Sequence, residues 1–309
     1  MLVAILAALA GLQGAEGKPE IPFLEGGWRR IAAPPKLERF GTGKEQTVDF
    51  TIFRAADGTW QLVSCIRNTA HPGDGRLLYR WEGKSLEDAD WEPRGIFLTS
   101  DAKLGHREGR AQAPHCVLEE GTYWLFYSST GAHALTSKDG KAFEPARAAD
   151  GAFRFFDMPR DLALFDHRAR DGKWYAFFTD IRPGKYPERK DHTVSYRTAP
   201  RLAGPWSAEK TDVGVVSPSP PGYLFAMAES PFVLERGGWL YRLEQLNVLA
   251  SRDLSRWEGP PVASLAGPNV FEYLAPELVV DGDRTWLAAY RDHGKAGIFL
   301  ARLGWKRAP

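Results

Sequence analysis

Residues 115–126 read HCVLEEGTYWLF: a short apolar run, a turn that contains Gly121, and an aromatic run. Glycine tolerates the positive φ of tight hairpin turns, so a Gly turn between two apolar runs indicates a β-hairpin. The same pattern occurs five times, at residues 51–60, 115–124, 162–175, 232–241 and 278–287. The sequence therefore predicts five β-hairpins in succession.

A third short strand is expected after each hairpin, at residues 77–81, 134–137, 193–196, 248–251 and 298–301. The hairpin glycines Gly58, Gly121, Gly172, Gly237 and Gly282 are 63, 51, 65 and 45 residues apart. This spacing is close to the period of about 40–50 residues that is typical of propeller blades, with insertions. Sheets arranged around an axis have no long free edges. We therefore predict an all-β fold, a five-bladed β-propeller.

The composition agrees with such a fold and excludes several classes of partner. Hydrophobic residues make up 43% of the 309 residues and charged residues 26%, which is typical of a soluble globular chain. The 11 Trp, 10 Tyr and 17 Phe suit strands, and we expect most of them to pack between blades. The formal charge is only +1, so there is no broad basic field for nucleic acid or an anionic membrane. Neither is expected as a partner.

The N-terminus carries an apolar run at residues 2–12 that is too short to span a bilayer. It resembles a signal-peptide core with a cleavage site near residue 17, although no Lys or Arg precedes it. We expect residues 1–17 to be a signal peptide of a secreted or periplasmic protein. Residues 18–35 are expected to be a lead-in, and residues 36–309 the propeller.

Two cysteines, Cys65 and Cys116, are too few for a disulfide framework or a cysteine-based zinc site. We expect buried free thiols, with a single disulfide as the alternative. The sequence has no phosphate-binding glycine loop, no metal-binding His pair and no Gly-x-Ser-x-Gly elbow. No metal and no cofactor is therefore expected.

Three of the predicted inner strands begin with an acidic residue: Asp49, Asp161 and Glu229. These acids precede their hairpin glycines by 9, 11 and 8 residues, so they are expected near one height. In a propeller the inner strands line the central channel, and each runs from one mouth of the channel to its hairpin at the far end. Residues at the starts of the inner strands, including the three acids, are therefore expected at the same mouth. The other two inner strands offer His115 and Glu277 instead.

Carboxylates that converge in a partly desolvated channel repel one another, so at least one should have a raised pKa and stay protonated near neutrality. Glycoside hydrolysis requires one protonated carboxyl that donates to the leaving oxygen. It also requires one carboxylate that activates water or attacks the anomeric carbon. The alternative is that each acid caps a strand or pairs with an arginine, such as Arg160 or Arg67.

At these positions the sequence resembles the five-bladed β-propeller glycoside hydrolases of the clan that contains families 43 and 32, and the related family 117. That group has an acid at the start of blade one, an Arg-Asp-Pro-like start of blade three and a Glu-x-Pro-like start of blade four. Here the three positions read Asp49-Phe50, Arg160-Asp161-Leu162 and Glu229-Ser230-Pro231. Phe50 and Leu162 stand where the family usually has proline. The resemblance covers about residues 45–305.

The resemblance implies that Asp49 is the general base or nucleophile, that Asp161 orients the substrate and tunes pKa, and that Glu229 is the general acid. It implies α-L-arabinofuranosides or β-xylosides as default substrates, and we favour the inverting route of family 43. Candidates for binding sugar hydroxyls or a carboxylate substituent are Arg67, His115, Arg160, Glu277, Arg291 and His293. The resemblance to family 117 also suggests His115 as an acid catalyst on anhydro-sugars.

Two other functions remain open on the sequence. A non-catalytic propeller would bind glycans or proteins with its surface loops, and its acids would be structural. A glycoside phosphorylase would need a cationic phosphate site near the acids.

Overall fold

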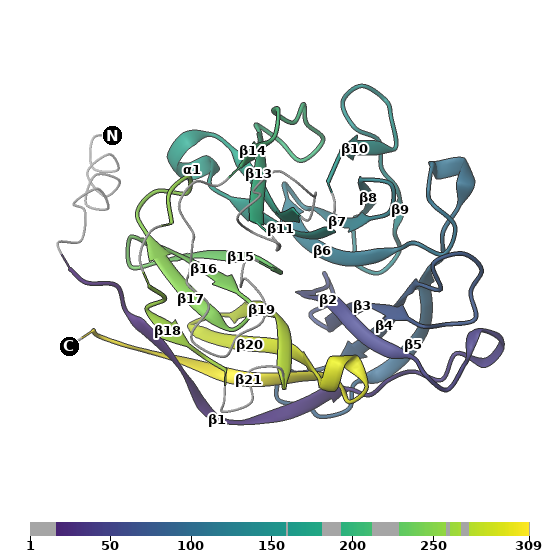
Figure 1. The fold of residues 1–309 in the computed structure, drawn as a ribbon, viewed down its shortest axis with the longest axis horizontal. Coiled ribbons are helices and arrows are strands. Elements are labelled where there is room, and N and C mark those ends of the chain that lie inside the picture. The colour runs from purple at the N-terminus through teal and green to yellow at the C-terminus, as the bar shows by residue number, and fades with distance from the viewer. Residues whose placement is uncertain are drawn as a thin grey trace, which may run out of the picture.

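A computed structural model of the protein describes residues 17–158, 160–180, 193–211, 229–257, 260–266 and 272–308. These residues form five antiparallel sheets around a central axis (Figure 1), so the predicted five-bladed β-propeller is confirmed. Helical structure in this part of the chain is limited to α1 (Arg168–Asp171) and the short turns η1 (Glu38–Phe40), η2 (Ala102–Leu104) and η3 (Asp292–Gly294). No helix within these described ranges is long and apolar enough to cross a membrane.

Each blade is built outward from an inner strand that lies next to the axis. Blade one contains β2 (Gln46–Arg54), β3 (Trp60–Arg67), β4 (Leu77–Gly83) and β5 (Glu92–Leu98). Blade two contains β6 (Gln112–Glu119), β7 (Thr122–Ser128), β8 (Ala132–Ser137), β9 (Glu144–Pro145) and β10 (Arg154–Phe156). Blade three contains β11 (Arg160–Asp166), β12 (Trp174–Asp180), β13 (Thr193–Ala199) and β14 (Lys210–Thr211). Blade four contains β15 (Phe232–Arg236), β16 (Trp239–Glu244), β17 (Asn247–Ser251) and β18 (Ala263–Ser264). Blade five contains β19 (Tyr273–Asp281), β20 (Arg284–Arg291), β21 (Gly297–Lys306) and β1 (Ile21–Ala32).

The five predicted hairpins join the first and second strands of the blades, and the predicted third strands are also present. The hairpin glycines all have positive φ, between 57° at Gly237 and 87° at Gly58. Glycine adopts positive φ readily, whereas a residue with a Cβ would do so at a steric cost. The turn chemistry that is visible in the sequence therefore sets the repeat.

Strand β1 corrects the expectation that residues 18–35 are a lead-in outside the propeller. It pairs antiparallel with β21, from Ile21 opposite Lys306 to Ala32 opposite Ile298, and forms the outer strand of blade five. Without it, the outer edge of β21 would be an unpaired strand edge, which is a liability in β-proteins. The two ends of the described chain thus close the ring together (Figure 1).

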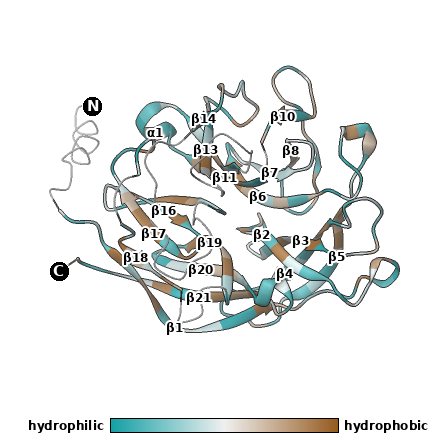
Figure 2. Cartoon of the chain, in the orientation of Figure 1, coloured by the Kyte–Doolittle hydropathy of each residue, from teal (hydrophilic) through white to brown (hydrophobic). Residues whose placement is uncertain are grey.

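Five apolar clusters hold the blades together, one between each pair of neighbours. The strands carry most of the hydrophobic residues, as Figure 2 shows. Trp81, Trp174 and Trp257 are among the largest fully buried side chains, which confirms that many of the aromatics serve inter-blade packing. Truncating such a residue to alanine typically costs about 3–5 kcal/mol. Cys65 and Cys116 are buried free thiols within the same packing.

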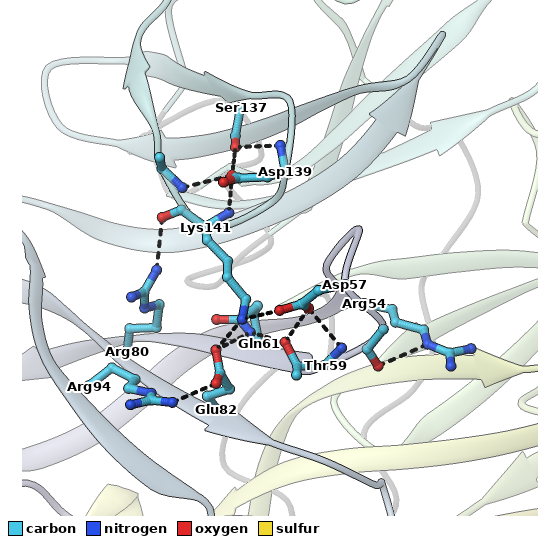
Figure 3. Close-up of polar contacts among 12 residues, drawn as sticks. Arg54, Asp57, Thr59, Gln61, Arg80, Glu82, Arg94, Ser137, Asp139 and Lys141 are labelled. Atoms are coloured by element: carbon cyan, nitrogen blue, oxygen red, sulfur yellow. Dashed lines mark hydrogen bonds and ion pairs between the residues drawn. The ribbon is translucent and has the colours of Figure 1, made fainter.

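A polar network joins blades one and two on the face of the ring that carries the hairpins, here called the hairpin face (Figure 3). Lys141 Nζ lies 2.5 Å from Asp57 Oδ2 and 2.9 Å from Glu82 Oε2. Arg94 Nη2 lies 2.6 Å from Glu82 Oε1, and Arg80 Nη1 donates to the Lys141 carbonyl at 2.8 Å. Charges of opposite sign therefore neutralise one another across this blade boundary.

Candidate active site

The opposite face of the ring is the mouth, where the inner strands begin. One residue near the start of each inner strand has a left-handed backbone: Asp49 (φ 38°), Ala113 (47°), Asp161 (57°), Ser230 (52°) and Ala275 (51°). Non-glycine residues rarely adopt this region, and such strain tends to collect at functional sites. In blades one, two, three and five the strand pairing also shifts register there. All five residues line one central cavity.

The fivefold repeat places the three acids at two levels rather than at one height. Asp49 and Asp161 occupy the left-handed position of their own blades, whereas Glu229 precedes the left-handed Ser230. By the repeat, the counterparts of Glu229 in blades two and three are Gln112 and Arg160. Glu229 therefore lies one residue nearer to the mouth than the two aspartates do.

Arg160 connects two of the acids. Its Nε lies 3.2 Å from Asp161 Oδ2, and its Nη2 forms an ion pair with Glu229 Oε1. Gln245 Nε2 donates to Glu229 Oε2 at 3.4 Å, and the Gln245 backbone N–H donates to the Glu229 carbonyl at 3.0 Å. The Gln245 side-chain oxygen accepts from the Ala275 N–H at 3.0 Å. Glu229 is thus held between blades three and five.

Asp49 has the perturbed carboxyl of the site. Burial is the main cause that raises its pKa to about 6, and the negative charge of Asp161 adds to the rise. The charges of Arg160, Arg76 and Arg67 act in the opposite direction. The expected raised pKa is therefore present at Asp49, although a pKa of about 6 leaves this carboxyl mostly ionised at pH 7 and not protonated as expected.

Two arginines beside Asp49 have neutral partners. Arg67 Nε donates to Gln46 Oε1 at 2.6 Å, and Arg76 Nη1 donates to Gln112 Oε1. No carboxylate among the described residues forms an ion pair with either guanidinium. Their positive charge therefore remains available at the mouth.

His115 and Glu277 lie one level below the aspartates, two residues beyond the left-handed position, and are buried. Burial lowers the pKa of His115 to about 4 and raises that of Glu277 to about 8. Glu277 Oε1 accepts from the Thr51 hydroxyl at 3.0 Å and from the Ile52 N–H at 3.1 Å. Both residues are mostly uncharged at pH 7. The charged groups of the site are therefore the acids and arginines nearer to the mouth.

The cavity that these levels enclose is small, about 40 Å³. One water needs about 10–15 Å³ by the same measure, so the cavity has room for a few waters and not for a sugar ring. Any ligand as large as a sugar ring would therefore have to lie above it, on the side of Arg160 and Glu229.

Two of the predicted substrate-binding residues, Arg291 and His293, have contacts that do not involve the three acids. Arg291 Nη2 lies 2.6 Å from Glu272 Oε1, and its guanidinium covers the rings of Tyr273 and Phe299. His293 is an exposed residue of η3. The acids, Arg160 and Arg67 are brought together at the mouth, whereas Arg291 is engaged with Glu272.

Sequence reasoning missed four residues of the mouth: Arg76, Gln112, Gln245 and Tyr290. Tyr290 belongs to β20, and burial followed by the charge of Asp49 raises the pKa of its hydroxyl. Gln112 was visible from the sequence, two residues before the blade-two proline Pro114, while the other three carry no local signal. In the described ranges, no group of three His, Cys, Asp or Glu side chains is arranged to hold a metal ion.

Comparison with known proteins identifies the fold. No protein-family model matches the sequence, and no curated protein matches it. A thermostable family-43 glycoside hydrolase superposes with a TM-score of 0.62 at 15% identity, covering 90% of this chain and 98% of that one. The α-L-arabinofuranosidase of Podospora anserina, solved with cellotriose, gives 0.61 at 13% identity and covers 93% and 97%. A family 117 glycoside hydrolase of the marine bacterium Zobellia galactanivorans gives 0.60 at 11% identity and covers 93% and 90%. The chain has the five-bladed propeller fold of these glycoside hydrolases.

Proposed function

We propose that this protein is a glycoside hydrolase that cleaves glycosidic bonds in plant or algal oligo- or polysaccharides. Asp49 is the general base, Asp161 orients the substrate and Glu229 is the general acid. The observation that carries the proposal is that acids from blades one, three and four meet at one mouth, two of them joined by Arg160. The fold shared with structures of glycoside hydrolases supports it.

The charges suit these roles at neutral pH. With a pKa of about 6, Asp49 is mostly ionised at pH 7 and accepts a proton from an attacking water. The ion pair with Arg160 favours a charged Glu229, so a sugar at the mouth must open this pair and Glu229 must take up a proton from solvent before it can donate one to the leaving oxygen. Asp161 should retain Arg160 when that happens, because Arg160 Nε also lies 3.2 Å from the Asp161 carboxylate.

Inversion at the anomeric carbon is part of the proposal. In that route water attacks from the face opposite to the general acid, with the two carboxyls about 6.5–9.5 Å apart. The default substrates are α-L-arabinofuranosides or β-xylosides. Solved neighbours that are described as an α-L-arabinofuranosidase and a β-xylosidase support this choice.

The test is hydrolysis of a panel of aryl glycosides and oligosaccharides, followed by NMR of the released anomer. The wild type is compared with Asp49→Asn and Glu229→Gln, and with Glu92→Gln as a control, because Glu92 is an exposed carboxylate far from the mouth. General acid–base catalysis contributes about 10²–10⁴-fold, so both mouth variants should lose that much rate while the control keeps it. An inert wild type that binds a glycan array would contradict the proposal and favour a non-catalytic propeller.

We also propose export from the cytoplasm, supported by the apolar run at residues 2–12, which lies outside the described residues. Mass spectrometry of the protein expressed in its export-competent host tests this. A mature N-terminus near residue 18 is expected, and an intact Met1 would contradict export by cleavage.

A further inference from the structure

Two loops at the mouth are locked together between blades one and two. Residues 68–76 follow β3, and residues 99–111 precede β6. The Asp74 N–H donates to the Glu108 carbonyl at 3.1 Å, and the Arg76 N–H donates to the Gly109 carbonyl at 2.8 Å. A Cβ at Gly73 would lie 2.1 Å from the Glu108 oxygen, so only glycine permits this approach. The contact fixes Arg76 beside the loop that carries Arg110.

The arginines of these loops share one carboxylate. Arg107 Nη2 lies 2.9 Å from Asp74 Oδ1, and Arg110 Nη1 lies 4.0 Å from Asp74 Oδ2. Within the described part of the chain, the Nε of Arg110 is buried and has no hydrogen-bond partner. The Arg76 guanidinium donates to the neutral amide of Gln112. Positive charge therefore exceeds negative charge at this part of the mouth.

Positive charge also lies close to the acids of the mouth. It belongs to three residues, here called the arginine group: Arg67, Arg76 and Arg110. Arg67 lies opposite Gln46 in the β2–β3 pairing, and Asp49 is three residues further along β2. Arg76 is bonded to Gln112, the blade-two counterpart of Glu229. The charges of Arg67 and Arg76 both lower the pKa of Asp49, in agreement with this proximity. The arginine group thus borders the space above the aspartates, where a sugar must bind.

We infer that the arginine group binds a negatively charged substituent of the glycan, a carboxylate or a sulfate ester, at the mouth. The charges of Arg67 and Arg76 act on Asp49, and Arg107 and Arg110 share Asp74, so these four guanidinium groups outnumber the two carboxylates and a bound anion would supply a further counter-charge. The planar fork of arginine matches the two oxygens of a carboxylate or sulfate. The inference rests on the proposed function. It narrows the substrates of the proposed hydrolase to acidic glycans and does not specify which glycosidic linkage is cleaved.

The test is equilibrium binding by calorimetry, which does not require turnover. The probes are glucuronate against glucose, galactose 6-sulfate against galactose, and inorganic phosphate. The wild type should bind at least one anionic sugar about tenfold or more tightly than its neutral parent, and added NaCl should weaken that binding. The double variant Arg67→Gln/Arg76→Gln should lose this preference. Arg76→Lys, which keeps the charge without the fork, should lose part of it.

The matched control is Arg94→Gln, which removes one arginine from the hairpin face and should leave the preference intact. Asp49→Asn should bind the anionic sugar at least as tightly as the wild type, because it removes a repelling charge. Equal binding of charged and neutral sugars by the wild type would overturn the inference. So would binding of phosphate as tight as that of the anionic sugars together with phosphate-dependent turnover, which would indicate a phosphorylase.

The two proposals fail separately. If the wild type hydrolyses glycosides but does not distinguish charged from neutral sugars, the inference falls and the hydrolase remains. If Asp49→Asn keeps full turnover while the arginine group still selects anions, the catalytic proposal falls and the binding site remains.

Discussion

The two faces of the propeller use arginine and lysine in opposite ways. On the hairpin face Lys141 contacts the carboxylates of Asp57 and Glu82 together (Figure 3). At the mouth Arg67 and Arg76 instead bond the amide oxygens of glutamines. The first arrangement neutralises charge and ties two blades, while the second holds a guanidinium in place by a neutral group and leaves its charge to act on Asp49.

We expect charges on the hairpin face to affect stability and charges at the mouth to affect function. The paired charges on the hairpin face range from the exposed Asp57 to the half-buried Lys141 and Glu82, and a pair with an exposed partner contributes little to stability. The mouth keeps its charge around strained, left-handed residues such as Asp49 and Asp161. Matched substitutions on the two faces should therefore have different consequences, and the following predictions make that comparison.

Arg160→Gln should have the largest effect. It removes the link between Asp161 and Glu229 and one of the charges that lower the pKa of Asp49. Because small displacements of reacting groups cost about 10²-fold, kcat/KM should fall by about that factor. The acid limb of the pH profile should also move to higher pH. Arg94→Gln on the hairpin face should change neither, and equal losses in both variants would contradict the comparison.

Glu277→Gln should change how stability depends on pH. The pKa of Glu277 is raised from 4.5 to about 8 by burial, so the folded state holds a proton that the unfolded chain releases. Stability should therefore fall as pH rises from 4.5 to 8, by at most about 1.4 kcal/mol per pH unit from this group. Denaturant melts of the variant should lack this component, so the variant should gain stability relative to the wild type as pH rises. A difference in stability that stays constant with pH, as expected for Glu92→Gln, would contradict a buried protonated Glu277.

Arg67→Gln should produce a smaller shift in the pH–rate profile. If Asp49 is the base, kcat/KM of the wild type rises with pH through about 6, where Asp49 loses its proton. Removing the Arg67 charge raises the pKa of Asp49, so the rise should move to higher pH by a fraction of a unit. A pH–rate profile that coincides with that of the wild type would show that the Arg67 charge does not influence the pKa of Asp49.

Lys141→Met should have the smallest effect. It removes the cation shared by Asp57 and Glu82 and should lower Tm slightly, since Asp57 is exposed and Lys141 and Glu82 are only half-buried. Activity should not change, because the substitution lies on the far face from the acids. A loss of kcat/KM at unchanged stability would show that the two faces are coupled.

Local signals were enough to predict the hairpins and the inner strands. A turn glycine such as Gly58 needs positive φ and stands between apolar runs, so it identifies its hairpin without any distant contact. The spacing from hairpin to acid then brought Asp49, Asp161 and Glu229 to one mouth. The one-residue offset of Glu229 was missed, because the bulges that define the level are not visible in the spacing.

Contacts between distant segments could not be predicted from the sequence. Strand β1 completes blade five by pairing with β21 at the other end of the chain. Arg76 reaches the site because its loop is bonded to residues near Gly109, and Gln245 reaches it from the turn between β16 and β17. Such contacts follow from how the blades close, which no local pattern encodes.

The most direct test of the central claim is the dependence of rate on the leaving group. In the proposed mechanism Glu229 protonates the leaving oxygen, while Asp49 acts on water. Glu229→Gln should therefore lose far less rate on a 2,4-dinitrophenyl glycoside than on an alkyl glycoside of the same sugar. Asp49→Asn should lose about 10²–10⁴-fold on both. Losses in Glu229→Gln that do not depend on the leaving group, or an Asp49→Asn variant with the wild-type rate, would contradict the account.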